Sequence, residues 1–451
     1  MKLISSSDAE SLICNLIASK RDALLKHWPI NSPIELEIMQ TKNMFLCENI
    51  YANRNAPPFD RVAKDGIAIN LEYIQKNSSL SLDSRDTIYF PIEGIQYAGH
   101  ERMSLKYIGN SIEVMTGAPL PYGCDTVIPY EEIDIDYNQQ KASIKNLSRN
   151  LKKFTNVLLE GSDFRKNDIL IKSGTKINSS HIGICASEGK GTLQVTSGPL
   201  ADLPILITST GDEIVTDFNT PLSPYQIRSS NIYCIRSELE LNGMKNINFL
   251  HFRDSKEEML DQLASIMEKY AVIILSGGIS KGKSDFVAEV LMNLGVETIF
   301  HGVAQKPGKP FYFGHKNNTL IFALPGNPLS SLICLRRYVI LGMEKLKQNS
   351  DNTNHHRQLC CILDDDHDNN HDNNHDHQLK IEENTPDNFT LFFPVKINFS
   401  SDAHVCAKLL PFNSSGDYLS IRDSDGIIEC KTKLKKGEVF PLYLWGHKNN
   451  A

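Results

Sequence analysis

The chain has 451 residues, a formal net charge of −7 and ten cysteines. This length exceeds one ordinary core, so about three or four domains are expected. The acidic balance argues against nucleic acid as the main partner, because such proteins usually carry a basic footprint. No apolar stretch is long enough to cross a bilayer, and residues 1–8 lack the apolar core of a signal peptide. The cysteines are scattered without a CxxC pair, so we expect a reduced, cytoplasmic protein with no membrane contact.

The first 150 residues predict one helix followed by β-structure. Ser7-Asp8-Ala9-Glu10 has the form of a capping box and is expected to open the helix. The apolar face of this helix would consist of Leu12, Ile13, Leu16 and Ile17. An extended passage follows over 34–50, and the turn signal Asp65-Gly66 leads into a strand. Short alternating runs between turn clusters then predict a small β-domain over 70–150.

The pattern changes again after residue 150. Residues 151–180 form another β-rich piece, which contains Gly161-Ser162-Asp163. From residue 181 strands and helices alternate, as in a doubly wound α/β domain. The expected strands are 205–207, 246–249 and 271–275, and the expected helices are 230–241, 256–270, 286–294 and 329–341.

Residues 271–328 mark the edge at which a binding site is expected. The β-branched run 271–275 indicates a strand buried on both faces, and it stops at Ser276-Gly277-Gly278. Lys306-Pro307-Gly308-Lys309-Pro310 comes next, and a pair of apolar runs ends at Pro325-Gly326-Asn327-Pro328. Ligands of open α/β sheets lie beyond the carboxyl ends of the strands, where two lysines would supply positive charge. The sequence therefore predicts a site for an anionic ligand.

Four acidic residues follow strands or open helices of the same predicted domain. They are Asp212, Glu213, Asp254 and Asp285. Each of them alone is explained by a helix cap or a turn. Together, at an edge that also holds lysines, they match the mixture with which a divalent metal bridges to an anion. Structural caps and a metal site both remain open on the residues alone.

A final β-rich domain is predicted over residues 349–451. It contains a His/Asp/Asn-rich tract, residues 364–377, in which His-Asp-Asn-Asn repeats with a period of four. The tract has no apolar residue to bury, so it is expected to be a disordered insert, with adventitious metal binding as the alternative. It is not expected to belong to the main site.

Several short motifs occur in a fixed order along nearly the whole chain. They are Pro58-Phe59-Asp60, Asp65-Gly66, Met115-Thr116-Gly117-Ala118-Pro119, Gly161-Ser162-Asp163, Ser209-Thr210-Gly211-Asp212-Glu213, Ser276-Gly277-Gly278, Lys306-Pro307-Gly308-Lys309-Pro310, Pro325-Gly326-Asn327-Pro328, Asn413-Ser414-Ser415-Gly416-Asp417 and Gly437-Glu438-Val439-Phe440-Pro441-Leu442. In order and spacing the chain resembles the molybdopterin molybdenumtransferases, the family of MoeA and the gephyrin E domain. No single glycine motif is decisive, but their joint arrangement is highly specific.

The resemblance implies an L-shaped homodimer of four-domain subunits with an α/β plus β fold. The implied ranges are 1–27 for a helix packing on the α/β domain, 28–51 with 151–180 for a linking β-rich domain, 52–150 for a β-domain, 181–348 for the molybdopterin-binding doubly wound α/β domain, and 349–451 for a C-terminal β-barrel-like domain. It also implies a site between the α/β domain of one subunit and the 52–150 domain of the other.

The resemblance further implies a reaction, the insertion of molybdate into adenylylated molybdopterin with pyrophosphate cleavage, AMP release and a need for Mg²⁺. The substrate-binding residues would be Ser276, Gly277, Gly278, Lys306, Lys309, Pro325, Gly326, Asn327 and Pro328. The metal ligands would be Asp212, Glu213, Asp254 and Asp285. The catalytic residues would be Asp60, Thr116, Asp163, Asp254 and Asp285. The adenylyltransferase of the same pathway would be a candidate partner.

The chain departs from the family's usual pattern at a few positions. Lys64 stands where Met is common, Leu158 and Leu159 where basic residues are typical, Gly302 where a lysine is expected, and Lys396 where some members have arginine. These departures leave open a second interpretation, a catalytically weakened homologue that binds the cofactor intermediate or scaffolds partners. A third is molybdopterin adenylyltransferase activity. The large β-domains argue against that activity, because a lone α/β domain suffices for it.

Overall fold

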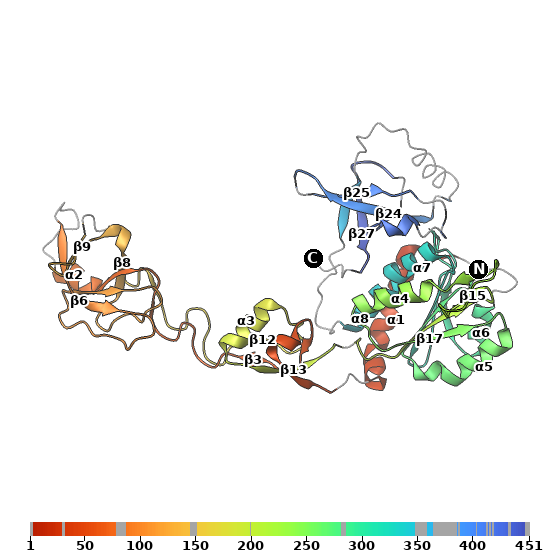
Figure 1. Ribbon diagram of the computed structural model, residues 1–451, viewed down its shortest axis with the longest axis horizontal. Coiled ribbons are helices and arrows are strands. Elements are labelled where there is room, and N and C mark those ends of the chain that lie inside the picture. The colour runs from red at the N-terminus through yellow and green to blue at the C-terminus, as the bar shows by residue number, and fades with distance from the viewer. Residues whose placement is uncertain are drawn as a thin grey trace. The chain divides into compact units, whose positions relative to one another are not determined.

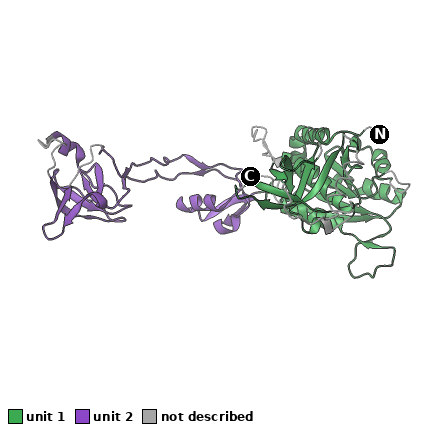
Figure 2. Cartoon of the chain, turned by 90° about the horizontal axis from the view of Figure 1, so that it is seen from above, with its two compact units in different colours: residues 1–32, 197–451 green, residues 33–196 purple. Residues whose placement is uncertain are grey.

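The protein is described by a computed structural model, in which the chain forms two compact units. The larger contains residues 1–32 and 197–451, and the smaller contains residues 33–196 (Figure 2). The described residues are 3–28, 32–77, 87–144, 151–198, 200–280, 286–347, 359–363, 386, 388–402, 404–411, 414, 416, 419–431 and 434–446. The predicted tract 364–377 therefore lies outside them. No helix in the described ranges is long and apolar enough to cross a membrane.

The first helix of the larger unit is α1 (Ser6–His27). The predicted helix is present, but its cap is Ser5 rather than Ser7, because the Ser5 hydroxyl accepts a hydrogen bond from the Asp8 amide at 3.1 Å. Its buried residues recur at roughly helical spacing and include Ala9, Ile13, Ile17 and Leu24. Leu12, predicted on this face, is 39% exposed. The helix packs against α8 (Ile340–Lys347) in the core of the larger unit.

A six-stranded sheet forms the centre of the larger unit, in the order β17-β14-β18-β22-β21-β19. Its strands are β14 (Ile205–Thr210), β17 (Ile247–Phe252), β18 (Val272–Ser276), β19 (Glu297–His301), β21 (Tyr312–Lys316) and β22 (Thr319–Leu324). The first four strands in the sheet order pair in parallel, and β21 pairs antiparallel with both of its neighbours, β22 and β19. The parallel strands end together at one edge of the sheet, as the sequence predicts.

Helices cover both faces of this sheet (Figure 1). They are α4 (Asn231–Leu241), α5 (Lys256–Ile266), α6 (Val287–Asn293) and α7 (Pro328–Cys334), and α7 continues through a π-helical segment, Leu335–Val339, into α8. Strand β14 shows why two layers are needed. Ile205 and Ile207 pack in the core with α1 and α4, while Leu206 packs in a second core with α5 and α6. A short ribbon of β15 (Ile214–Val215) and β16 (Ile227–Arg228) follows β14.

The C-terminal part of the larger unit is a closed five-stranded barrel. Its strands are β23 (Cys360–Leu363), β24 (Thr390–Phe399), β25 (Val405–Leu409), β26 (Gly426–Cys430) and β27 (Val439–Leu444), with α10 (Leu419–Arg422) before β26. The pairing β24–β26 closes the ring. A short strand from the α/β part, β20 (Gln305–Lys306), pairs in parallel with β24 at the barrel wall. The predicted fold class, a doubly wound α/β domain with β-rich domains and a terminal barrel, is confirmed.

The smaller unit is built mainly from short strands. One group comprises β1 (Ile34–Glu37), β2 (Phe45–Leu46), β3 (Ile50–Tyr51), β12 (Ile169–Ile171), β13 (Thr192–Thr196) and α3 (Ser179–Ser187). The other comprises β5 (Gly66–Ile69), α2 (Leu71–Asn77), β6 (Ile88–Gln96), β7 (Ser111–Val114), β8 (Thr126–Pro129), β9 (Asp134–Asp136) and β10 (Lys141–Ile144), preceded by β4 (Arg61–Val62), which pairs with β11 (Val157–Leu158).

The end of the smaller unit differs from the expected start of the α/β domain at residue 181. Strand β13 pairs with both β1 and β2, so residues 181–196 belong to the smaller unit. Periodicity alone gives no sign of this, because the helix α3 and strand β13 have the same alternation as the α/β region that follows. The other predicted domain limits remain predictions.

Candidate functional site

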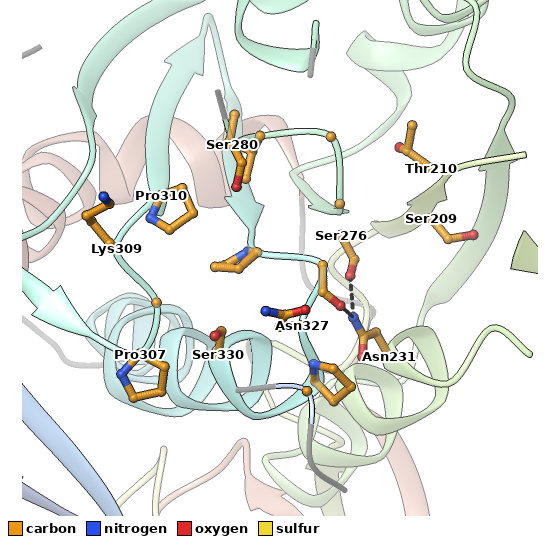
Figure 3. Close-up of a pocket in the computed structure, with 18 of the residues that line it drawn as sticks. Ser209, Thr210, Asn231, Ser276, Ser280, Pro307, Lys309, Pro310, Asn327 and Ser330 are labelled. Atoms are coloured by element: carbon orange, nitrogen blue, oxygen red, sulfur yellow. Dashed lines mark hydrogen bonds between the residues drawn. The ribbon is translucent and has the colours of Figure 1, made fainter. Parts of the chain in front are cut away.

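A pocket of about 1420 Å³ lies at the carboxyl edge of the sheet in the larger unit. Its walls come from the ends of β14, β18 and β22, from the loop of residues 306–310 and from the start of α4 (Figure 3). Phe389, just before β24 of the barrel, also lines it. The lining includes all nine residues predicted to bind substrate, which are Ser276, Gly277, Gly278, Lys306, Lys309, Pro325, Gly326, Asn327 and Pro328. The structure thus gathers three motifs that are up to about 50 residues apart in sequence.

Two glycines shape the floor of the pocket. Gly277 and Gly278 have φ angles of +97° and +66°, a region that side-chain-bearing residues rarely adopt. A Cβ on Gly278 would lie 2.8 Å from a methyl group of Val287. The Gly277 amide donates to the Leu324 carbonyl at 3.1 Å, which ties the end of β18 to that of β22. The backbone is therefore held open to close approach by a ligand.

Asn231, at the first position of α4, joins the loops around the pocket. Its Nδ2 donates to the Ser276 hydroxyl at 3.0 Å and to the Gly326 carbonyl at 2.7 Å (Figure 3). No sequence motif singles out Asn231. The polar run Ser229-Ser230-Asn231, just where a helix was predicted to begin after a strand, is the signal that could have found it.

Hydroxyl groups at the end of β14 also face the pocket. The Ser209 hydroxyl is hydrogen-bonded to Nδ1 of His251 at 2.9 Å. The Thr210 hydroxyl is buried and has no hydrogen-bond partner among the described residues. Leaving such a group unsatisfied costs about 1–3 kcal/mol. A ligand that accepts a hydrogen bond would remove this cost.

The charged side chains of the described lining are mainly cationic. The cationic ones are Lys306, Lys309 and Arg228, and the one carboxylate in that described lining is that of Glu213. Arg228 donates to the carbonyl of Thr220 at 2.6 Å and to that of Asp217, so it also holds the loop between β15 and β16. A concave site with this balance favours an anionic ligand.

The predicted metal ligands are only partly brought together. The Asp254 amide donates to Oδ1 of Asp212 at 3.3 Å, which places the ends of β14 and β17 in contact. Glu213 lines the pocket, whereas Asp212 and Asp254 do not, and Asp285 lies outside the described residues. Within the described ranges no group of three or more His, Cys, Asp or Glu side chains is arranged to hold a metal ion. The four-carboxylate metal site stays a prediction.

The remaining predicted catalytic residues, Asp60, Thr116 and Asp163, belong to the smaller unit. The Thr116 amide donates to Oδ1 of Asp65 at 2.5 Å, and this hydrogen bond lowers the pKa of that carboxyl. The Glu160 amide donates to Oδ1 of Asp60 at 2.9 Å. The Asp163 amide donates to the carbonyl of Ala56 at 2.9 Å. We call the loops that carry these residues (56–65, 115–121 and 160–164) the carboxylate cluster.

The family departures have distinct surroundings. Gly302 has φ +103°, so a lysine at this position would be strained in the present backbone. Lys64 is exposed, and Leu158 lies opposite Arg61 in the pairing of β11 with β4. Lys396 forms an ion pair with Asp425 at 2.8 Å and does not line the pocket.

Comparison with known proteins gives this architecture a family. Residues 15–189 match the model for the MoeA N-terminal region (domain I and II), and residues 206–345 match that for a probable molybdopterin binding domain. A molybdopterin molybdenumtransferase of Synechocystis sp. is 36% identical over 435 residues, which cover 95% of this chain and 99% of that protein. The chain belongs to the molybdopterin molybdenumtransferase family.

Two further proteins are similar to this chain, one in sequence and one in fold. The molybdopterin molybdenumtransferase of Haemophilus influenzae is 29% identical over 72% of this chain and 76% of its own length. The crystal structure of the molybdopterin biosynthesis MoeA protein of Pyrococcus horikoshii OT3 covers 98% of this chain and 100% of its own, with a TM-score of 0.68 at 19% identity. The latter supports the fold that this molybdenumtransferase family shares.

Proposed function

We propose that this transferase acts as a cytoplasmic homodimer that inserts molybdate into adenylylated molybdopterin, cleaves its pyrophosphate linkage and releases AMP. The observation that carries the proposal is the large, cationic pocket at the carboxyl edge of a molybdopterin-binding type of sheet. The substrate carries a pyrophosphate and molybdate is a second anion, so the site must offset negative charge before the two can meet.

The chain's own groups suggest how the pocket would hold these anions. Lys306 and Lys309 would act as point charges on phosphate or molybdate oxygens. The Thr210 hydroxyl, buried without a partner among the described residues, would donate to an acceptor atom of the ligand. The open backbone at Gly277 and Gly278 would let the substrate approach within hydrogen-bonding distance.

We propose Mg²⁺ as the metal, held by carboxylates at the neighbouring strand ends. Mg²⁺ prefers oxygen ligands and is commonly held by one or two carboxylates together with substrate phosphates. Asp212 and Asp254, which meet at the ends of β14 and β17, would be two of its ligands, with Glu213 and Asp285 as the others. Bound there, the ion would withdraw charge from the pyrophosphate.

We further propose that the carboxylate cluster of a second subunit completes the site through Asp60, Thr116 and Asp163. A mixing experiment tests this arrangement. Lys306→Ala and Asp60→Asn are each expected to be inactive alone. After subunit exchange, roughly half of the dimers would be mixed, each with one intact site, so about a quarter of wild-type activity would return. No recovery in a mixture shown to have exchanged subunits would exclude a shared site.

AMP release tests the proposed reaction directly. The protein is incubated with adenylylated molybdopterin, molybdate and Mg²⁺, and AMP is measured against time. Release that requires both molybdate and Mg²⁺ is the expected result. Release no faster than without protein would overturn the proposal.

One observation keeps the catalytically weakened homologue as a second candidate. Leu158 and Leu159 are 37% and 41% exposed where the family typically has basic residues, so neither side chain can offer a positive charge to an anion. The weakened homologue would bind AMP or the adenylylated substrate but release AMP at background rate. Rescue by Gly302→Lys is not expected, because the +103° φ angle disfavours any side chain there.

A further inference from the structure

Gln305, immediately before Lys306, is a buried amide behind the two-lysine loop (residues 306–310). Its side chain is fully buried, and both ends of the amide are used. Nε2 donates to the Pro307 carbonyl at 3.1 Å, and Oε1 accepts from the Tyr338 hydroxyl at 2.5 Å. A buried amide that bridges a loop and a helix restricts the loop to one position, because losing either bond leaves a buried polar atom unsatisfied.

The loop fits closely onto this amide. A Cβ on Gly308 would lie 2.5 Å from Nε2 of Gln305 and 2.8 Å from Sγ of Cys334, so only glycine is accommodated. The φ angle of Gly308, +98°, also requires glycine. The Cys334 thiol donates a weak hydrogen bond to the Gly308 carbonyl at 3.7 Å. The turn between the two lysines therefore rests on Gln305 and Cys334.

Tyr338 is itself held rigidly. Its ring stacks on Phe311 with centroids 5.0 Å apart and an interplanar angle of 19°. Burial raises the pKa of Tyr338 well above its ordinary value, so the hydroxyl stays protonated and able to donate. The hydroxyl that donates to Gln305 is therefore held in one position.

Tyr338 lies in the π-helical segment. The two residues before it, Arg336 and Arg337, bind other parts of the unit. Arg337 forms ion pairs with Glu429 of the barrel at 2.8 Å and with Glu10 of α1 at 2.7 Å. Arg336 donates to the barrel carbonyl of Leu444 at 2.7 Å. Three successive side chains of the π-helical segment thus reach four partner residues, and π-helical turns are often found at functional sites.

The strand that leads into the loop is also held by the segment before α1 and by the barrel. Ala304 donates to the carbonyl of Ile4, before α1, at 2.7 Å, and accepts from the Thr390 amide of β24 at 2.9 Å. Gln305 and Lys306 then pair with β24. The two-lysine loop is consequently fixed by the first helix region, the barrel and the π-helical segment together.

We propose that Gln305 and Tyr338 are positioning residues that hold the two-lysine loop in its anion-binding geometry. The identity of the anion rests on the proposed function, whereas the restraint on the loop does not. Gln305 also lines the pocket, whereas Tyr338 does not, so Tyr338→Phe tests the restraint apart from any direct contact with the ligand. Their effect would be exerted through the positions of Lys306 and Lys309.

Three variants and one matched control test this role. Tyr338→Phe removes only the hydroxyl, Gln305→Met removes the amide at similar length, and the third variant combines both. Tyr312→Phe is the control, because Tyr312 is equally buried in the same unit and its hydroxyl also makes one hydrogen bond, to Thr298 at 2.9 Å. Backbone hydrogen exchange over residues 303–311 reports the loop without any ligand, and calorimetric titration with AMP reports the pocket.

We expect each single variant to speed exchange of the loop and to weaken AMP binding, both by about tenfold, while the control changes neither by more than about twofold. The double variant is expected to regain part of the melting temperature lost in Gln305→Met, since the Tyr338 hydroxyl is no longer left unsatisfied, whereas the Pro307 carbonyl still lacks its donor. It is not expected to regain AMP affinity. If Gln305→Met does not fold, the result for Tyr338→Phe decides the proposal.

The outcomes separate the possible failures. Unchanged loop exchange in Tyr338→Phe overturns the positioning role. AMP affinity that recovers together with melting temperature in the double variant also overturns it, because the residues would then act only on stability. Faster loop exchange in a protein that binds no AMP even as wild type supports the restraint and contradicts the proposed function instead.

Discussion

The pocket of the larger unit and the carboxylate cluster of the smaller unit are built in opposite ways. In the pocket, Ser276, Ser209 and Thr210 are at most 8% exposed and sit at the ends of buried parallel strands. In the cluster, Asp65, Thr116 and Asp163 are exposed, and the Asp65 carboxylate accepts a hydrogen bond from the Thr116 amide. The pocket is thus shaped before any ligand arrives, while the cluster offers polar groups whose strength depends on what excludes water from them.

The largest expected effect is on the lysines of the pocket. Lys306→Ala should lower the rate of AMP release by about 100-fold or more, because a charge on the reacting phosphates is lost. The melting temperature should change little, since the side chain is exposed. Lys269→Ala, at an exposed lysine of the same unit, should leave both measurements unchanged. Unfolding of Lys306→Ala would mean that the lysine is structural and that the pocket assignment is wrong.

The next largest effect concerns the floor of the pocket, which is arranged before a ligand binds. Gly278→Ala should destabilise the larger unit by about 2–4 kcal/mol, because the new Cβ meets Val287 and the φ angle of +66° disfavours alanine. Gly295→Ala is the matched control, with a φ angle of +73° and no atom within 4 Å of the new Cβ. It should cost only about 1 kcal/mol. If chemical denaturation showed equal losses of unfolding free energy in the two variants, close packing of the floor would contribute nothing to stability.

The smallest effect concerns the exposed cluster. The Thr116 amide lowers the pKa of Asp65 below its ordinary value of 3.8 in the folded state. The resulting stabilisation is present above that ordinary value and is lost as the pH falls through the lowered pKa. Because the carboxylate is exposed, the contribution is under about 1 kcal/mol.

Asp65→Asn should therefore make the acid loss of stability of the smaller unit shallower as the pH falls below that ordinary value of 3.8, as measured by urea unfolding of the full chain. Lys64→Ala, at the exposed neighbouring residue, should leave that profile as it is. A change in Asp65→Asn as large as that of Gly278→Ala would contradict the distinction between the two regions.

Local sequence signals predicted most of the fold and the loops of the pocket. The apolar run 271–275 and the glycines after it correspond to β18 and its exit turn, within one residue. The Asp65-Gly66 turn leads into β5 as expected. These features depend on residues adjacent in sequence, so periodicity and turn chemistry are enough to find them. The family resemblance then supplied the reaction, which local patterns do not contain.

Contacts between distant residues were not predictable in the same way. Nothing in the pattern showed that Asn231 would join Ser276 and Gly326, or that β13 would pair with β1 and β2. The capping residue of α1 was also misassigned, because Ser5 and Ser7 are equivalent in composition and only the geometry of the first turn separates them.

By itself the sequence determined the strand ends, the glycines that open the backbone and the two lysines that make the edge cationic. The tertiary structure alone decided which groups support those lysines. Gln305 and Tyr338 are 33 residues apart, and the segment that anchors Tyr338 reaches Glu10 and Glu429. Such partners are selected when buried polar groups must be satisfied in the packed core, and that requirement exists only after distant elements have come together.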